Sequence, residues 1–88
     1  MKSENDLKIT GTVVSDVNLT SGQSSTRFRI AHNFGGGKKP LFLDCVQIIK
    51  PGTDPEIPRK GDCVRVRAYL QMHGESIEAV VKSFVVMP

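Results

Sequence analysis

Apolar and polar residues alternate with a period of two through most of this chain, and turn-forming residues interrupt the alternation at short intervals. Five runs show this alternation or a valine-rich composition, and they cover residues 7–14, 26–32, 41–48, 62–70 and 76–86. Because a period of two places successive side chains on opposite faces of an extended strand, each run predicts a β-strand. We therefore expect an all-β fold.

The segments between the runs leave no room for a real helix. Turn and loop residues fill three of these segments, which are 18–25, 33–40 and 71–75. The fourth, residues 50–61, contains three prolines and two glycines, so at most one short helical turn fits, over residues 53–59.

Parity within the runs assigns side chains to the interior and to the surface. The expected interior positions are Leu7, Ile9, Val13, Phe28, Ile30, Val64, Val66 and Ala68. Gly11 predicts a bulge or a sharp bend in the first strand. We expect Cys45 and Cys63 to be core or near-core residues, with a disulfide as the alternative. Val80 and Val86 are expected to be exposed on the last strand.

Eighty-eight residues suffice for one small domain, which we place at residues 1–88 with a disordered N-terminus over residues 1–5. With so few strands, closure into a barrel is the better way to remove exposed edges. The predicted architecture is therefore a five-stranded Greek-key β-barrel, the OB-fold, with the helix between the third and fourth strands reduced or absent.

Several classes of function are disfavoured. The apolar stretches fall far short of the ~20 residues of a membrane helix, and residues 1–8 are too polar for a secretory signal, so we expect no membrane partner and a cytoplasmic location. Residues 35–39 (GGGKK) lack the hydroxyl residue and the following helix of a phosphate-binding loop. His32 and His73 form neither a catalytic set nor zinc-ligand spacing with the cysteines. We expect no enzymatic activity, no cofactor and no metal.

Positive charge is segregated along the chain. Residues 27–39 carry four basic residues and no acid, residues 59–67 carry four basic residues and Asp62, and the remaining segments are net negative. Such segregation is what a polyanion-binding surface requires, because each neutralised phosphate releases counterions. Solvated strand faces are the alternative interpretation.

Several weak motifs occur in the order found in bacterial single-stranded DNA-binding proteins. Residues 7–16 (LKITGTVVSD), Ser21 with Gly22, and residues 28–33 (FRIAHN) resemble the opening of that family. Its third, fourth and fifth strands are matched by Phe42 with residues 44–46 (DCV), residues 60–66 (KGDCVRV) and residues 78–81 (EAVV). The resemblance covers about residues 5–87, and the primosomal OB-fold protein of replication restart is similar too.

The resemblance implies sequence-tolerant binding of single-stranded DNA in replication, repair and recombination, by a homodimer or a homotetramer. The chain also departs from the family pattern. It contains no tryptophan, so Phe42 stands in for one stacking residue, while Ile48 and Asp44 occupy positions that are usually aromatic and basic. It ends at Pro88 without a Gly- and Pro-rich tail, so we expect no recruitment of partners through an acidic C-terminal tip.

Binding of a single strand by an OB-fold requires a basic groove and exposed aromatic faces. The candidate nucleic-acid-binding residues are Arg27, Arg29, Phe34, Lys38, Lys39, Phe42, Arg65, Arg67 and Tyr69. Phe34 is the best single candidate, since a mobile glycine loop cannot hold it in a core. Alternatives stay open for Tyr69, as a packing residue, and for Arg65 and Arg67, as contacts to a partner subunit.

Two functions follow. In the first, the chain binds single-stranded DNA, with RNA not distinguished. In the second, it is an OB-fold interaction or oligomerisation module of a replication or repair complex, with weak or no nucleic-acid binding. The missing tryptophans and Asp44 favour the second function. The basic runs and the loop at Phe34 favour the first, which we prefer.

Overall fold

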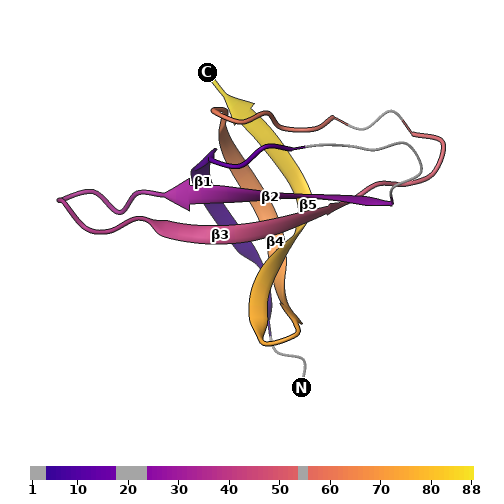
Figure 1. Ribbon diagram of the computed structural model, residues 1–88, viewed down its shortest axis with the longest axis horizontal. Helices are drawn as coiled ribbons and strands as arrows, with labels where there is room; N and C mark the ends of the chain where they lie inside the picture. Colours follow the sequence, from indigo (N-terminus) through magenta and orange to yellow (C-terminus); the bar gives the residue numbers. More distant parts are fainter. Residues whose placement is uncertain (1–3, 18–23, 54–55) are drawn as a thin grey trace.

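The computed structural model describes residues 4–17, 24–53 and 56–88. Its strands are β1 (Leu7–Val13), β2 (Ser25–His32), β3 (Leu41–Ile48), β4 (Cys63–His73) and β5 (Ser76–Met87). They form a closed barrel in the order β1-β2-β3-β5-β4 (Figure 1). No described residue is helical, including residues 49–53 and 56–62 between β3 and β4. The predicted five-stranded Greek-key barrel is confirmed.

Two pairings between distant segments close the barrel. β1 runs antiparallel to β4, with Leu7 opposite Ala68, and β3 runs parallel to β5, with Cys45 opposite Ala79. The β4 and β5 ladder continues past the barrel to the pair of His73 and Ser76, so this hairpin projects as an arm (Figure 1). The loop over residues 33–40 projects from the β2 and β3 ends in another direction (Figure 1).

The alternating residues of the strands fill the interior as parity predicts. The buried members of the core cluster are Val13, Phe28, Ile30, Cys45, Val64, Val66, Ala68 and Ala79. Ile9 and Phe84 are partly buried and pack against this cluster. Full burial of one large aliphatic or aromatic side chain stabilises the fold by about 1.5–3 kcal/mol. The interior is thus built from small contributions of every strand.

Gly11 does not mark a bulge, which was one of the two alternatives that the sequence predicted. It pairs in regular register with Val64, and the irregularity in the ladders that involve β4 lies between Arg67 and Ala68. A Cβ atom at Gly11 would lie 2.8 Å from the carbonyl oxygen of Ala31. The position requires glycine because the β2 backbone approaches β1 closely here.

Two surface assignments were wrong and one was right. Val80 is only 5% exposed, whereas Val86 is 41% exposed as predicted. Cys63 is exposed and is not a core residue, because it precedes the inward Val64 and so points outward. Cys45 is buried, and both cysteines are free thiols, so the alternative of a disulfide between them is not realised.

The two thiols should differ in reactivity. Burial, together with the Asp44 carboxylate, raises the pKa of Cys45 to about 12, so at about pH 8 it is a protonated, inaccessible thiol. We expect iodoacetamide to modify Cys63 in the native protein and to modify Cys45 only after unfolding, as measured by mass spectrometry of peptides. Equal labelling of both thiols in the native state would contradict this assignment.

The chain before β1 lies along the projecting arm. The Asn5 side chain accepts a hydrogen bond from the Leu70 backbone N–H at 2.8 Å and donates one to the Leu70 carbonyl at 2.7 Å. Residues 1–3 of the expected disordered N-terminus, and most of the predicted turn over residues 18–25, lie outside the described residues. In the described ranges, no helix has the length and apolar character needed to cross a membrane.

Candidate nucleic-acid interface

The outward faces of β2 and β3 bring part of the predicted site together. Arg29 lies opposite Asp44, and Ala31 lies opposite Phe42, in the antiparallel ladder of these strands. Arg27, on the same face of β2, lies opposite Val46. We call this face, together with loop residues 33–40, the β2–β3 surface.

Arg29 is already paired with an acid of the same surface. Its Nε donates a hydrogen bond to Asp44 Oδ1 at 2.8 Å, and both side chains are about half exposed, at 53% and 51%. The hydrogen bond and the charge of Asp44 raise the pKa of Arg29. Asp44, flagged in the sequence as an acid at a usually basic position, therefore neutralises its cross-strand neighbour.

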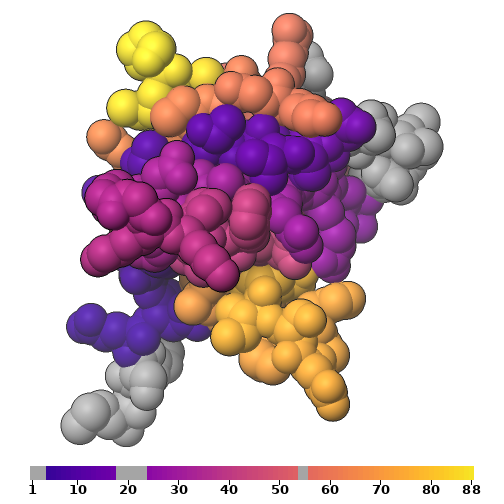
Figure 2. All heavy atoms as spheres, turned by 60° about the vertical axis from the view of Figure 1, so that its left-hand side comes forward, coloured from indigo at the N-terminus to yellow at the C-terminus, as the bar shows by residue number. Residues whose placement is uncertain are grey.

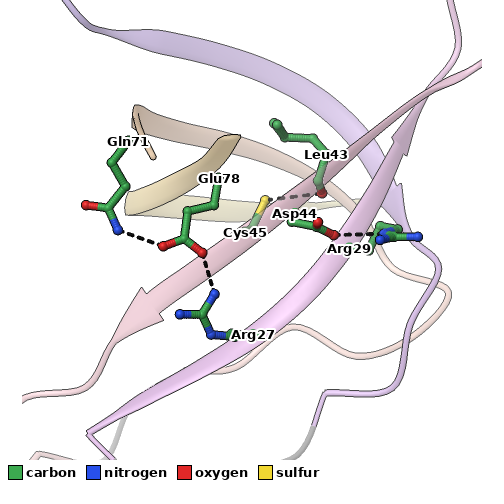
Figure 3. A network of polar contacts seen from close by, with 7 residues as sticks. All are labelled: Arg27, Arg29, Leu43, Asp44, Cys45, Gln71 and Glu78. Carbon is green, nitrogen blue, oxygen red and sulfur yellow. Dashed lines mark hydrogen bonds and ion pairs between the residues drawn. The ribbon is translucent and has the colours of Figure 1, made fainter. Parts of the chain in front are cut away.

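Arg27 is paired with a buried acid on β5. It forms an ion pair with Glu78, whose other carboxylate oxygen accepts a hydrogen bond from Gln71 Nε2 at 2.7 Å (Figure 3). The Gln71 hydrogen bond, and then the hydrogen bond and charge of Arg27, lower the pKa of Glu78. Because Glu78 is only 3% exposed, this contact ties β2 to the base of the arm.

Val80 lies in a row of outward side chains that runs from β2 to β4. Val46 and Val80 face each other across the β3 and β5 ladder, on the face opposite to inward Cys45 and Ala79. Val80 also lies opposite Tyr69 of β4, and Val46 lies opposite Arg27 of β2. The two outward valines, flanked by these longer side chains, are only 3% and 5% exposed.

The loop over residues 33–40 presents an aromatic ring. Gly35, Gly36 and Gly37 all have positive φ values, of 80°, 61° and 75°, which a residue with a Cβ rarely adopts. Phe34, immediately before them, packs edge-on against the His32 ring with centroids 4.9 Å apart. His32 Nδ1 lies 2.6 Å from the Thr10 carbonyl oxygen, so the ring that supports Phe34 is itself anchored.

Exposed aromatic and basic residues gather at this end of the β2–β3 surface. Phe34 and Phe42 are 57% and 55% exposed, and Lys38 and Lys39 are also exposed. Figure 2 shows the magenta atoms of this region directly above the orange-to-yellow atoms of the projecting arm. The aromatic faces and the lysines thus meet solvent at the loop end of the β2–β3 surface.

A cleft of about 710 Å³ separates the β2–β3 surface from the arm. It opens where β3 and β5 diverge beyond the pair of Cys45 and Ala79. The residues that line it are Val14, Ser15, Arg27, Phe28, Arg29, Phe42, Asp44, Cys45, His73, Ser76, Ile77 and Glu78. Its volume lies within the range of ligand pockets, so it can admit one or more nucleobases.

The remaining predicted site residues lie elsewhere on the barrel. Arg65 is opposite Thr10 and Val85, and Arg67 is opposite Lys8 and Ser83. Since β4 is flanked by β1 and β5, these side chains lie across the barrel from β2 and β3. The predicted groove is therefore divided, and we call this second face the β4 surface.

The β4 surface contains its own network. Asp6 pairs with Arg67 at 3.4 Å and with Lys82 at 3.5 Å, and Lys82 Nζ lies 5.8 Å from the centroid of the Tyr69 ring. Hydrogen bonding and charge from Arg67, with a smaller contribution from Lys82, lower the pKa of Asp6. Tyr69 is 37% exposed, so its ring is partly packed and partly open to solvent.

Sequence reasoning missed Glu78, His32 and Lys82 as members of these networks. A signal existed for Glu78, since an acid two residues from Val80 shares its strand face. Among the described residues, no group of three His, Cys, Asp or Glu side chains could hold a metal ion.

The closed barrel, the projecting arm and the cleft beside it define the molecule as an OB-fold protein. Solved structures share this fold over nearly the whole chain. Rim1, a mitochondrial single-stranded DNA-binding protein from S. cerevisiae, is similar with a TM-score of 0.76 and 17% identity, over 98% of this chain and 96% of its own.

Two further structures are similar. The dimeric N-terminal domain of PriB from Thermoanaerobacter tencongensis has a TM-score of 0.68 and 13% identity, covering 96% of this chain and 97% of its own. The SSB domain of a Synechococcus protein has a TM-score of 0.71 and 16% identity, covering 96% and 97%. No family model and no curated protein matches the sequence. The fold implied by the sequence resemblance is thus confirmed.

Proposed function

We propose that the chain binds single-stranded DNA, with little sequence preference, through the β2–β3 surface. One observation carries the proposal: Phe34 and Phe42, 57% and 55% exposed, lie at the same end of two paired strands, with Lys38 and Lys39 in the loop between them. Large exposed aromatic residues beside lysines suit a ligand with both π-faces and phosphates. The structures with the same fold include proteins described as single-stranded DNA-binding.

In the proposed site, aromatic side chains bind the bases and lysines bind the phosphates. Unpaired bases stack on aromatic faces at about 1–3 kcal/mol per base, and lysines attract the backbone. A duplex keeps its bases stacked inside, so it forgoes the aromatic contribution. RNA offers the same unpaired bases and phosphates, so we expect RNA strands to bind as well.

The test is a titration of a fluorescently labelled thymidine strand of about 30 nucleotides, followed by anisotropy at low and at physiological salt. A duplex of equal length is measured in parallel. We expect micromolar or tighter binding that prefers the single strand and weakens with salt. The absence of binding even at low salt would overturn the proposal.

The loop lysines should appear in the salt dependence. In the described part of the chain neither Lys38 nor Lys39 forms an ion pair, so both are available to phosphates. Replacing both with alanine should reduce the slope of log affinity against log salt by about 1.4, at about 0.7 per phosphate. Replacing Lys8 and Lys50, which are exposed elsewhere, removes the same charge and should leave the slope nearly unchanged. An equal change in both variants would exclude the loop from the site.

The second candidate function is assembly through the β4 surface and β5. Val85 is 60% exposed on β5 and lies opposite Arg65, whereas Val86, 41% exposed, lies opposite Val64 on the other side of the strand. An exposed valine beside an arginine is suited to a protein partner, and a symmetric copy is the simplest one. We propose a cytoplasmic, non-enzymatic homodimer or homotetramer, which sedimentation at several protein concentrations would test.

A further inference from the structure

Both arginines of the proposed DNA-binding surface are held by carboxylates of the same cleft. Arg27 pairs with Glu78, and Arg29 pairs with Asp44 (Figure 3). All four residues line the cleft, so two positive charges meet two negative charges there. The cleft has the groups of a phosphate-binding site but little net charge with which to attract a polyanion.

The two acids are fixed in place by different means. Glu78 is only 3% exposed and is also held by the Gln71 amide, so it cannot swing away from Arg27 without leaving a buried charge. Asp44 sits directly opposite Arg29 in the strand register. A phosphate that contacts either guanidinium therefore competes with a carboxylate that is already in position.

We propose that Asp44 and Glu78 determine the specificity of this surface, suppressing the binding of polyanions that offer charge alone. The inference rests on the proposed function. A single strand offsets the competition by stacking bases on Phe34 and Phe42, which lie outside the ion pairs. A duplex or a sulfated polysaccharide has no unpaired base to stack. Its only attraction to the cleft would be electrostatic, and the two acids neutralise the charge of the arginines there. The two acids thus lower the affinity for duplexes and sulfated polysaccharides and do not raise the affinity for single strands.

The test compares the wild type with the double variant Asp44→Asn and Glu78→Gln. Affinities are measured for the thymidine strand, for a duplex of equal length and for heparin, at several salt concentrations. Both substitutions keep the shape of the side chain. Asp44→Asn removes the charge that neutralises Arg29, and Glu78→Gln removes the charge that neutralises Arg27. We expect duplex and heparin binding to strengthen about tenfold or more at low salt and single-strand binding only about threefold, with the duplex salt slope steeper by up to about 1.8.

Two control variants separate local charge release from net charge and from damage. Asp6→Asn removes one acid from the β4 surface and frees Arg67 and Lys82, so it should leave the preference for single strands unchanged. Combining Arg29→Gln with Asp44→Asn removes the released cation and should return duplex affinity to the wild-type value. Because Asp44 is half exposed, Asp44→Asn alone provides the measurement if the double variant does not fold.

The outcomes distinguish the two proposals. If the wild type fails to bind the thymidine strand at low salt, the proposed function fails and the inference falls with it. If the wild type binds but the double variant keeps the same ratio of single-strand to duplex affinity, the inference alone fails. An equal gain in the Asp6→Asn variant would also overturn it, because net charge would then be sufficient.

Discussion

Replacing Phe34 and Phe42 together with alanine should weaken binding to the thymidine strand by about 2–5 kcal/mol, since each stacked base contributes about 1–3 kcal/mol. This corresponds to a loss of about 30-fold to several thousand-fold in affinity. Both rings are more than half exposed, at 57% and 55%, so the free energy of unfolding should change little. Anisotropy titration gives the first quantity, and urea denaturation gives the second.

The matched control is Val85→Ala on β5. Val85 is 60% exposed, so the substitution removes a comparably exposed apolar side chain from the β4 surface. We expect it to leave single-strand affinity unchanged. A double phenylalanine variant that loses stability but keeps its affinity would show that the rings serve packing, and the site would then have to be sought on the β4 surface.

Replacing Gly11 with alanine should destabilise the barrel by about 1–3 kcal/mol, the usual cost of forcing a methyl group into a packed interior. The new Cβ would lie 2.8 Å from the Ala31 carbonyl oxygen and 3.2 Å from the Ile30 Cβ, so either β1 or β2 must shift. At a tolerant position the same substitution would instead stabilise the fold by about 0.4–1 kcal/mol. A lower urea midpoint for Gly11→Ala would therefore show that the close approach of the strands requires glycine, and a higher midpoint would show that the position tolerates a Cβ atom.

The neighbouring variant Thr10→Ala serves as the control for Gly11→Ala. Thr10 lies in the same strand with an exposed side chain, and its contact to His32 uses the backbone carbonyl, which the substitution retains. We expect only a small effect on stability. A Gly11→Ala protein as stable as the wild type would mean that the two strands separate here at no cost.

The sequence predicted the strands well because alternation is a local property. The predicted strand over residues 41–48 matches β3 (Leu41–Ile48), and parity placed Val64, Val66 and Ala68 in the core. Errors arose where side chains of neighbouring strands override parity. Val80 points outward by parity, yet it is buried in the row between Val46 of β3 and Tyr69 of β4.

The candidate site was harder to predict. Parity shows that a side chain points out of a closed barrel, but it does not show on which side of the barrel the residue lies. Arg29 and Arg65 both point outward, but strand order places them on surfaces across the barrel from each other. The ion pair of Arg29 with Asp44 depends on the register of two strands, which the alternation pattern leaves undetermined to within a shift of two residues. Phe34, by contrast, could be recognised as exposed without knowing the topology, because it precedes three glycines.

The order in which the strands meet constrains how the chain can assemble. The arm formed by β4 and β5 is a local hairpin, whereas Leu7 must find Ala68 and Cys45 must find Ala79. Closing such long loops costs chain entropy before any contact compensates for it, which slows folding of barrels relative to helical proteins of this size. β2 can pair with β1 and β3 as soon as these strands are made, but the other edge of β1 stays unpaired until β4 leaves the ribosome, and the other edge of β3 until β5 does. The barrel can therefore close only after both β4 and β5 have been synthesised.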